Sequence, residues 1–256
     1  RNSVGPGRAT NASSSEIGEF SDITPRQAYR IGISDGGRLP AVVLVISLMG
    51  FGALCRESGL GLDFALVQLV TMWALPGQIA FVELYSTGST ILATTLAVAM
   101  ANARFMPMTA TLVPLLRPGM RQPAWLYAMA HLVSFNAWIW VLRRCPELPP
   151  ERRAAYYMGF VTMTGSAGLI GAVVGYFLAG VVPGIVMLTL VFVNIVYFVL
   201  MMADARGLAA ILAVIAGGVA GPLLHLATSD WGLLLSGVIG GTLAFGVARL
   251  WRGRHV

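Results

Sequence analysis

Charged side chains are scarce in this sequence of 256 residues: they make up 11% of it, and lysine is absent altogether. A soluble globular domain usually has about 25% charged residues, so this chain has too few to cover a water-exposed surface. Hydrophobic residues make up 57%, and several uncharged runs reach the about 20 apolar residues that a helix needs to cross a bilayer. We therefore predict an all-α protein, a polytopic bundle of membrane-spanning helices.

Catalytic and metal-binding motifs are absent as well. The sequence has no HExxH, no GxSxG and no Cys/His cluster, and its two cysteines, Cys55 and Cys145, follow neither a disulfide nor a metal-ligand pattern. We predict a protein that is not an enzyme and needs no cofactor or metal. The net charge of +6 comes from arginine alone. Because these arginines stand at the ends of apolar runs, without clusters of stacking aromatics, we expect no nucleic-acid partner.

The apolar runs and their interruptions predict how the chain is organised. Residues 1–24 are rich in Ser, Gly and Asn and predict a disordered tail, and residues 25–256 predict a single transmembrane domain. Thr24-Pro25 has the pattern of a helix start, and an amphipathic helix on the membrane surface is expected at about 25–36. Spans are predicted at about 39–55, 64–84, 90–116, 123–142, 156–180, 185–202, 208–227 and 232–250. This makes about eight spans, and a count of seven stays open because the second and third are interrupted.

Arginine in the connecting loops predicts the orientation. With eight spans, eleven arginines fall on the side of both termini and three, Arg56, Arg117 and Arg121, fall on the other. Cytoplasmic loops are enriched in positive charge, so both termini are predicted to be cytoplasmic. Glycines four residues apart, such as Gly171 and Gly175, predict close helix packing. Whether they face this chain or a partner subunit stays open.

Polar and helix-breaking residues are concentrated in the second and third apolar segments. Pro76 has no amide hydrogen and predicts a break in the second helix, next to Gly77 and Gln78. Asn102 and Arg104 stand in the middle of the third segment. The N-terminus of a half-helix attracts anionic groups such as a carboxylate, and transporters commonly bind substrate at broken helices. The alternative is a simple proline kink with Gln78 hydrogen-bonded to a neighbouring helix.

The ionisable residues in these segments need an explanation too. An arginine at membrane depth costs at least about 2.5 kcal/mol, so Arg104 needs a partner: Glu83, the carbonyl end of a broken helix or a substrate carboxylate, unless its side chain reaches an interface. Glu83 is the leading proton-coupling candidate because it is a carboxylate within a span. His131 is a second candidate. Like Asn136 and Asn194, it also fits an interhelical hydrogen bond.

Three motifs carry a resemblance to a known family. They are the run Gly-Phe-Gly-Ala-Leu-Cys-Arg-Glu-Ser-Gly-Leu at residues 50–60, the pair Gly77-Gln78, and Asn102-Ala103-Arg104. In the order and spacing of these motifs the sequence resembles the AzlC-like large subunits of branched-chain amino acid exporters. The resemblance is specific over residues 29–117 and more general beyond them.

The resemblance implies a function. AzlC-like proteins export branched-chain amino acids, and in some cases methionine, across the bacterial inner membrane, driven by the proton gradient and together with a small AzlD-like membrane partner. On this interpretation Pro76 and Gly77 open the second helix. Gln78 and Asn102 then hydrogen-bond the polar head group of the amino acid, and Arg104 pairs with its carboxylate.

The fourth span departs from the family pattern. Many members have an Asp-Glu pair there, whereas the comparable stretch of this chain runs from His131 to Asn136 without an acidic residue. The departure bears on proton coupling or on the choice of substrate. A function of another class also stays open, namely a membrane scaffold or assembly protein whose polar residues only hold helices together.

Overall fold

The structure is a computed structural model that describes residues 23–203 except 121 and 123, together with 212, 215–221, 223, 240, 242 and 246. The regular elements of the described residues are all helices, with no strand among them, and this confirms the all-α prediction. The predicted tail, except for residues 23 and 24, lies outside the described residues. Most of the spans predicted at 208–227 and 232–250 and the side chain of Asn194 also lie outside them.

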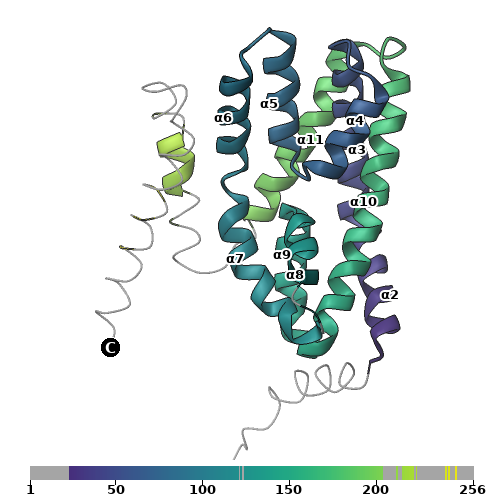
Figure 1. The fold of residues 1–256 in the computed structure, drawn as a ribbon, viewed down its shortest axis with the longest axis vertical. Coiled ribbons are helices and arrows are strands. Elements are labelled where there is room, and N and C mark those ends of the chain that lie inside the picture. The colour runs from purple at the N-terminus through teal and green to yellow at the C-terminus, as the bar shows by residue number, and fades with distance from the viewer. Residues whose placement is uncertain are drawn as a thin grey trace, which may run out of the picture. The chain divides into compact units, whose positions relative to one another are not determined.

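The helices follow one another along the chain (Figure 1). In order they are α2 (Pro25–Gly36), α3 (Leu39–Glu57), α4 (Leu62–Thr71), α5 (Leu75–Ser86), α6 (Ile91–Asn102), α7 (Phe105–Leu116), the 3-10 turn η1 (Arg117–Gly119), α8 (Ala124–His131), α9 (Phe135–Arg144), the 3-10 turns η2 (Cys145–Glu147) and η3 (Pro150–Arg152), α10 (Arg153–Leu178) and α11 (Gly184–Ala203). Helices α3, α10 and α11 begin and end close to the spans predicted at 39–55, 156–180 and 185–202.

Breaks divide the second, third and fourth predicted segments. The second is divided into α4 and α5, and the third into α6 and α7, as Pro76 and the Asn102-Ala103-Arg104 motif predict. The fourth segment was expected to be one helix, but it consists of α8 and α9, which are bent by 118° at their junction. Ser134 has an extended backbone there and caps α9, because its hydroxyl accepts a hydrogen bond from the Ala137 amide at 3.2 Å.

The lengths of the helices fit a membrane protein. Among the described residues, Leu39–Glu57 and Pro150–Leu178 are long and apolar enough to cross a bilayer, and up to four crossings result if each of two bent helix pairs forms one span. One such pair is α6 with α7, and the other is α8 with α9. The count of about eight spans stays a prediction.

The chain divides into two compact units, which are described separately. The first comprises the residues up to Val45, Leu69–Trp73 and Arg104–Gly171. The second comprises Ile46–Gln68, Ala74–Ala103 and the described residues from Ala172 onward. Helices α3, α4 and α10 each contribute residues to both units. That residues 25–256 form a single transmembrane domain stays a prediction.

In the first unit, glycine brings α2 against α10 (Figure 1). A Cβ at Gly32 would lie 2.1 Å from the carbonyl oxygen of Tyr156, and one at Gly159 would lie 2.0 Å from that of Tyr29. Backbone cannot give way to such an overlap, so both positions require glycine. Tyr156 and Phe160 are fully buried in a core to which α7 and α9 also contribute. One face of the helix predicted to lie on the membrane surface is therefore packed against α10.

Further glycines of α10 approach α3. A Cβ at Gly171 would lie 2.5 Å from the Val45 carbonyl oxygen in the first unit. One at Gly175 would lie 1.9 Å from the Met49 carbonyl oxygen in the second unit. The sequence prediction that this pair of glycines allows close packing is confirmed, and the packing is within this chain.

We expect Gly175→Val to prevent α10 from reaching its position on α3. Overpacking usually costs about 1 to 3 kcal/mol, and here the new side chain meets the Met49 backbone, which cannot rotate away. The expected result is loss of most of the monodisperse peak in size-exclusion chromatography of the detergent-solubilised protein. Ser166→Val introduces the same side chain at an exposed position of the same helix and serves as the control. Equal peaks for the two variants would contradict the close contact.

Candidate functional site

Pro76 places the start of α5 inside the second hydrophobic segment. Helix α4 ends at Thr71, and Ala74 has an extended backbone with φ −146° and ψ 94° before α5 begins at Leu75. Proline fits in the first helical turn because an amide hydrogen there has no partner within the helix. Ala74 provides no side-chain hydrogen bond to this helix start. The half-helix N-terminus that the sequence predicts is therefore present.

The side chain of Asn102 lies directly against Gly77. A Cβ at Gly77 would lie 2.5 Å from both Nδ2 and Oδ1 of Asn102, so a larger residue at position 77 would displace this amide. Asn102 is the last residue of α6, and α5 and α6 lie side by side in the second unit (Figure 1). The structure thus brings two of the predicted site residues, which are far apart in the sequence, to the start of the same half-helix.

Gln78 follows at the same helix start and is only 1% exposed. Its Nε2 donates a hydrogen bond to the backbone oxygen of Gln68 in α4, at 3.4 Å. This contact matches the alternative in which Gln78 joins neighbouring helices. Pro76, Gly77, Gln78 and Asn102 all belong to the second unit, and the part of the predicted site that they form lies within one compact unit.

Arg104 belongs to the first unit and stands at the break before α7. It is the N-cap residue of α7, and its side chain is exposed. The guanidinium lies over the ring of its neighbour Phe105, with Cζ 5.5 Å from the ring centroid. The guanidinium is therefore accessible from outside the protein, and its depth in the membrane stays a prediction.

The two proton-coupling candidates have different surroundings. Glu83 is exposed on α5 in the second unit. His131 is the last residue of α8, and its Nε2 lies 2.8 Å from the backbone oxygen of Val70 in the first unit. Because a carbonyl oxygen can only accept, this nitrogen must be the donor. His131 therefore makes the interhelical hydrogen bond that was its alternative role.

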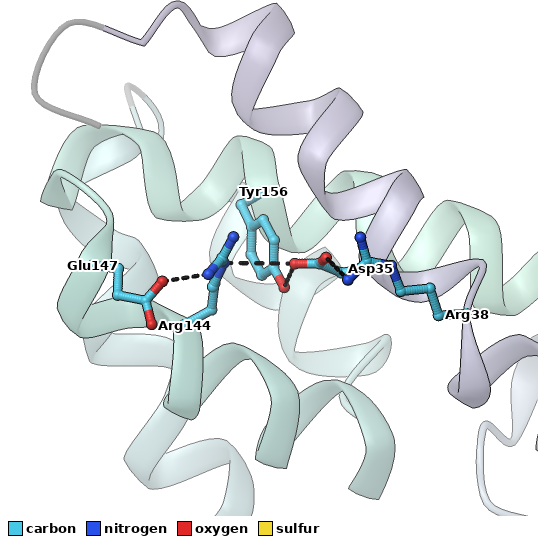
Figure 2. Close-up of polar contacts among 5 residues, drawn as sticks. All are labelled: Asp35, Arg38, Arg144, Glu147 and Tyr156. Atoms are coloured by element: carbon cyan, nitrogen blue, oxygen red, sulfur yellow. Dashed lines mark hydrogen bonds and ion pairs between the residues drawn. The ribbon is translucent and has the colours of Figure 1, made fainter. Parts of the chain in front are cut away.

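A polar cluster that the sequence did not predict surrounds Asp35 in the first unit (Figure 2). Asp35 is 7% exposed, and its Oδ2 accepts a hydrogen bond from the Tyr156 hydroxyl at 3.0 Å. Arg144 Nε lies 3.6 Å from the same oxygen, and Arg38 lies 3.7 Å from Oδ1. Arg144 is also paired with Glu147. The cluster joins α2, α9 and α10 around one buried carboxylate.

A local signal pointed to Asp35, although not to its partners. Asp35 shares a face of α2 with Ala28, Gly32 and Gly36, and all four residues are buried. A carboxylate on the packed face of a helix needs a cationic or hydrogen-bonding partner. Arg144 is 109 residues away in the sequence, and its role as a topology signal gave no reason to pair it with α2.

The described helices indicate the general class of this protein. Apolar helices long enough to cross a bilayer, together with helices broken at buried polar residues, indicate a helical membrane protein. The family model described as AzlC protein matches residues 40–182, more than half of the 256 residues. The chain belongs to the AzlC family, which is linked to branched-chain amino acid transport. No curated protein and no solved structure matches it.

Proposed function

We propose that this protein is the large subunit of an exporter for branched-chain amino acids and methionine in the inner membrane of a bacterium, with both termini in the cytoplasm. The observation that carries the proposal is the contact of Asn102 with Gly77 at the uncapped start of α5. It places a side-chain amide beside the positive end of a half-helix, where a carboxylate binds favourably. Membership of a family linked to branched-chain amino acid transport supports the choice of substrate.

The residues at the helix breaks have separate tasks in this proposal. Gln78 and Asn102 hydrogen-bond the polar head group of the amino acid, and the start of α5 attracts its carboxylate. Arg104 is exposed, and we assign its guanidinium to the substrate carboxylate because a planar guanidinium binds a carboxylate through two hydrogen bonds. Glu83 carries the proton, because it is a carboxylate within the second segment, whereas the Nε2 of His131 is hydrogen-bonded to the Val70 backbone oxygen.

Efflux of labelled leucine, isoleucine, valine and methionine from preloaded cells tests the proposal. We expect efflux when the chain is produced with a small AzlD-like membrane partner, little without that partner, and collapse when a protonophore removes the proton gradient. The control is the partner produced alone. Absence of efflux for all four amino acids in both settings would contradict the proposed function, and efflux that persists with the protonophore would contradict only the proton coupling.

A membrane scaffold is the second candidate, and two hydrogen bonds favour it. Gln78 and His131 both contact backbone oxygens of the segment that contains α4, at Gln68 and Val70, as residues that only hold helices together would do. A scaffold predicts that conservative changes at Gln78 or Asn102 lower detergent stability and any activity in parallel. The transport function instead predicts substitutions that remove efflux at unchanged stability.

A further inference from the structure

The second unit contains buried amide atoms whose hydrogen-bonding capacity is not used by the described residues. Gln68 on α4 is only 5% exposed, and neither its Nε2 nor its Oε1 has a hydrogen-bond partner. The Oδ1 of Asn102 is buried and likewise has none. Leaving such a group unpaired is costly, and most buried polar atoms in proteins are paired. Two side-chain amides in this condition in one compact unit point to a polar ligand.

The two amides are joined by contacts around the start of α5. The backbone oxygen of Gln68 accepts the hydrogen bond from Gln78. Gln78 is the neighbour of Gly77, and the side chain of Asn102 lies against Gly77. The backbone of Gln68 therefore contacts the same half-helix start on which Asn102 packs, although Gln68 stands before the break and no sequence motif includes it.

The chemistry of these atoms indicates what they bind. The amide of Gln68 offers N–H donors and one acceptor oxygen, and Asn102 adds a second acceptor. Neither residue is charged, so the pair suits a head group that has both signs of charge and is neutral overall. A zwitterionic α-amino acid presents an ammonium group to acceptors and a carboxylate to donors on the same carbon atom.

We propose that Gln68 is a further substrate-binding residue, whose side-chain amide holds the head group of the amino acid together with Asn102. The Oε1 of Gln68 and the Oδ1 of Asn102 accept hydrogen bonds from the ammonium group, and the Nε2 of Gln68 donates to the carboxylate. This inference rests on the proposed transport function and narrows it: the substrate needs both an amine and a carboxylate.

A binding role and a structural role differ in their effect on stability. Methionine has nearly the length and volume of glutamine but leaves no strong polar atom to satisfy. If the partner of Gln68 is the substrate, Gln68→Met leaves the ligand-free protein as stable or makes it more stable, because an unpaired buried amide is removed. If Gln68 instead holds helices together, the same variant is less stable.

The test combines thermal unfolding and transport on the purified complex with its small partner. We expect L-leucine to raise the unfolding temperature of the unchanged protein, whereas isoamylamine, which lacks the carboxylate, and isocaproate, which lacks the amine, do not. Gln68→Met should lose this response and show a KM for leucine efflux that is at least about tenfold higher, since a hydrogen bond to a charged group contributes about 1.5 to 3 kcal/mol. Its unfolding temperature without ligand should not fall.

Thr94→Val is the matched control. Thr94 is a buried polar residue of α6 in the same unit, but its hydroxyl donates to the Thr90 backbone oxygen at 3.0 Å. We therefore expect Thr94→Val to respond to leucine as the unchanged protein does.

Three kinds of outcome would contradict parts of the proposal. A wild-type KM in Gln68→Met, or a parallel loss of ligand-free stability and efflux, would overturn the inference while the proposed function stands. Stabilisation of the unchanged protein by isoamylamine or isocaproate would overturn the zwitterion requirement. If the unchanged complex neither exports nor binds any of the four amino acids, the proposed function fails and this inference fails with it.

Discussion

Replacing Arg104 by alanine is expected to abolish most export of branched-chain amino acids while leaving the protein folded in the membrane. The side chain is exposed, and its guanidinium contacts the ring of the adjacent Phe105, so its removal disturbs little packing. A charge-assisted hydrogen bond to a carboxylate contributes about 1.5 to 3 kcal/mol, which corresponds to a loss of about 10- to 150-fold in transport efficiency. Initial efflux rates, normalised to the amount of protein in the membrane, provide the measurement.

Two further variants make this result specific. Arg104→Lys keeps the charge but loses the planar fork that binds a carboxylate through two hydrogen bonds, so an intermediate rate is expected. Arg117→Ala removes another exposed arginine, in η1 after α7, and should leave export unchanged. Wild-type flux in Arg104→Ala at equal protein level would refute the role assigned to this guanidinium.

Replacing Asp35 by asparagine is expected to produce the largest loss of stability among single polar substitutions in the first unit. The change keeps the shape of the side chain but leaves Arg144 beside a neutral group. Removing one partner of a buried ion pair costs about 3 to 5 kcal/mol, and we expect about 2 to 3 kcal/mol here because the Arg144 side chain is 31% exposed. Thermal unfolding of the detergent-solubilised protein, followed by tryptophan fluorescence, measures the difference.

Glu147→Gln is the matched control for Asp35. Glu147 pairs with the same Arg144, but its side chain is 47% exposed, and ion pairs at the surface contribute at most about 1 kcal/mol. The unfolding temperature of Glu147→Gln should stay close to that of the unchanged protein. Equal losses in both variants would show that burial of the Asp35 carboxylate does not set the energy of the cluster.

The sequence predicted those breaks that a single residue causes. Pro76 has no amide hydrogen, so a break in the second segment followed from its position. No proline marks the junction of α8 and α9. The signal there is Ser134, and a serine becomes a helix cap only when the chain around it leaves the helical conformation. For this reason the fourth segment appeared to be one continuous helix.

Contacts between distant parts of the chain were beyond sequence reasoning. Gly77, Gln78 and Asn102 are unusual residues in apolar segments, but nothing in the sequence places the Asn102 amide on Gly77. The same holds for Asp35 and Tyr156, which are 121 residues apart in the sequence. Such pairs depend on how helices pack, and the packing is set by many small contacts rather than by one motif.

The packing of Asn102 on Gly77 also has a mechanical consequence. Helices α5 and α6 are joined at one end by a tight turn, in which Gly88 adopts φ +70°. At the other end the Asn102 side chain fills the space beside Gly77. The hairpin therefore has a contact at both ends, the turn at one and the packing of Asn102 on Gly77 at the other. In the proposed transport cycle we therefore expect α5 and α6 to move together as one hairpin, so that the Gly77–Asn102 contact is kept while the hairpin moves.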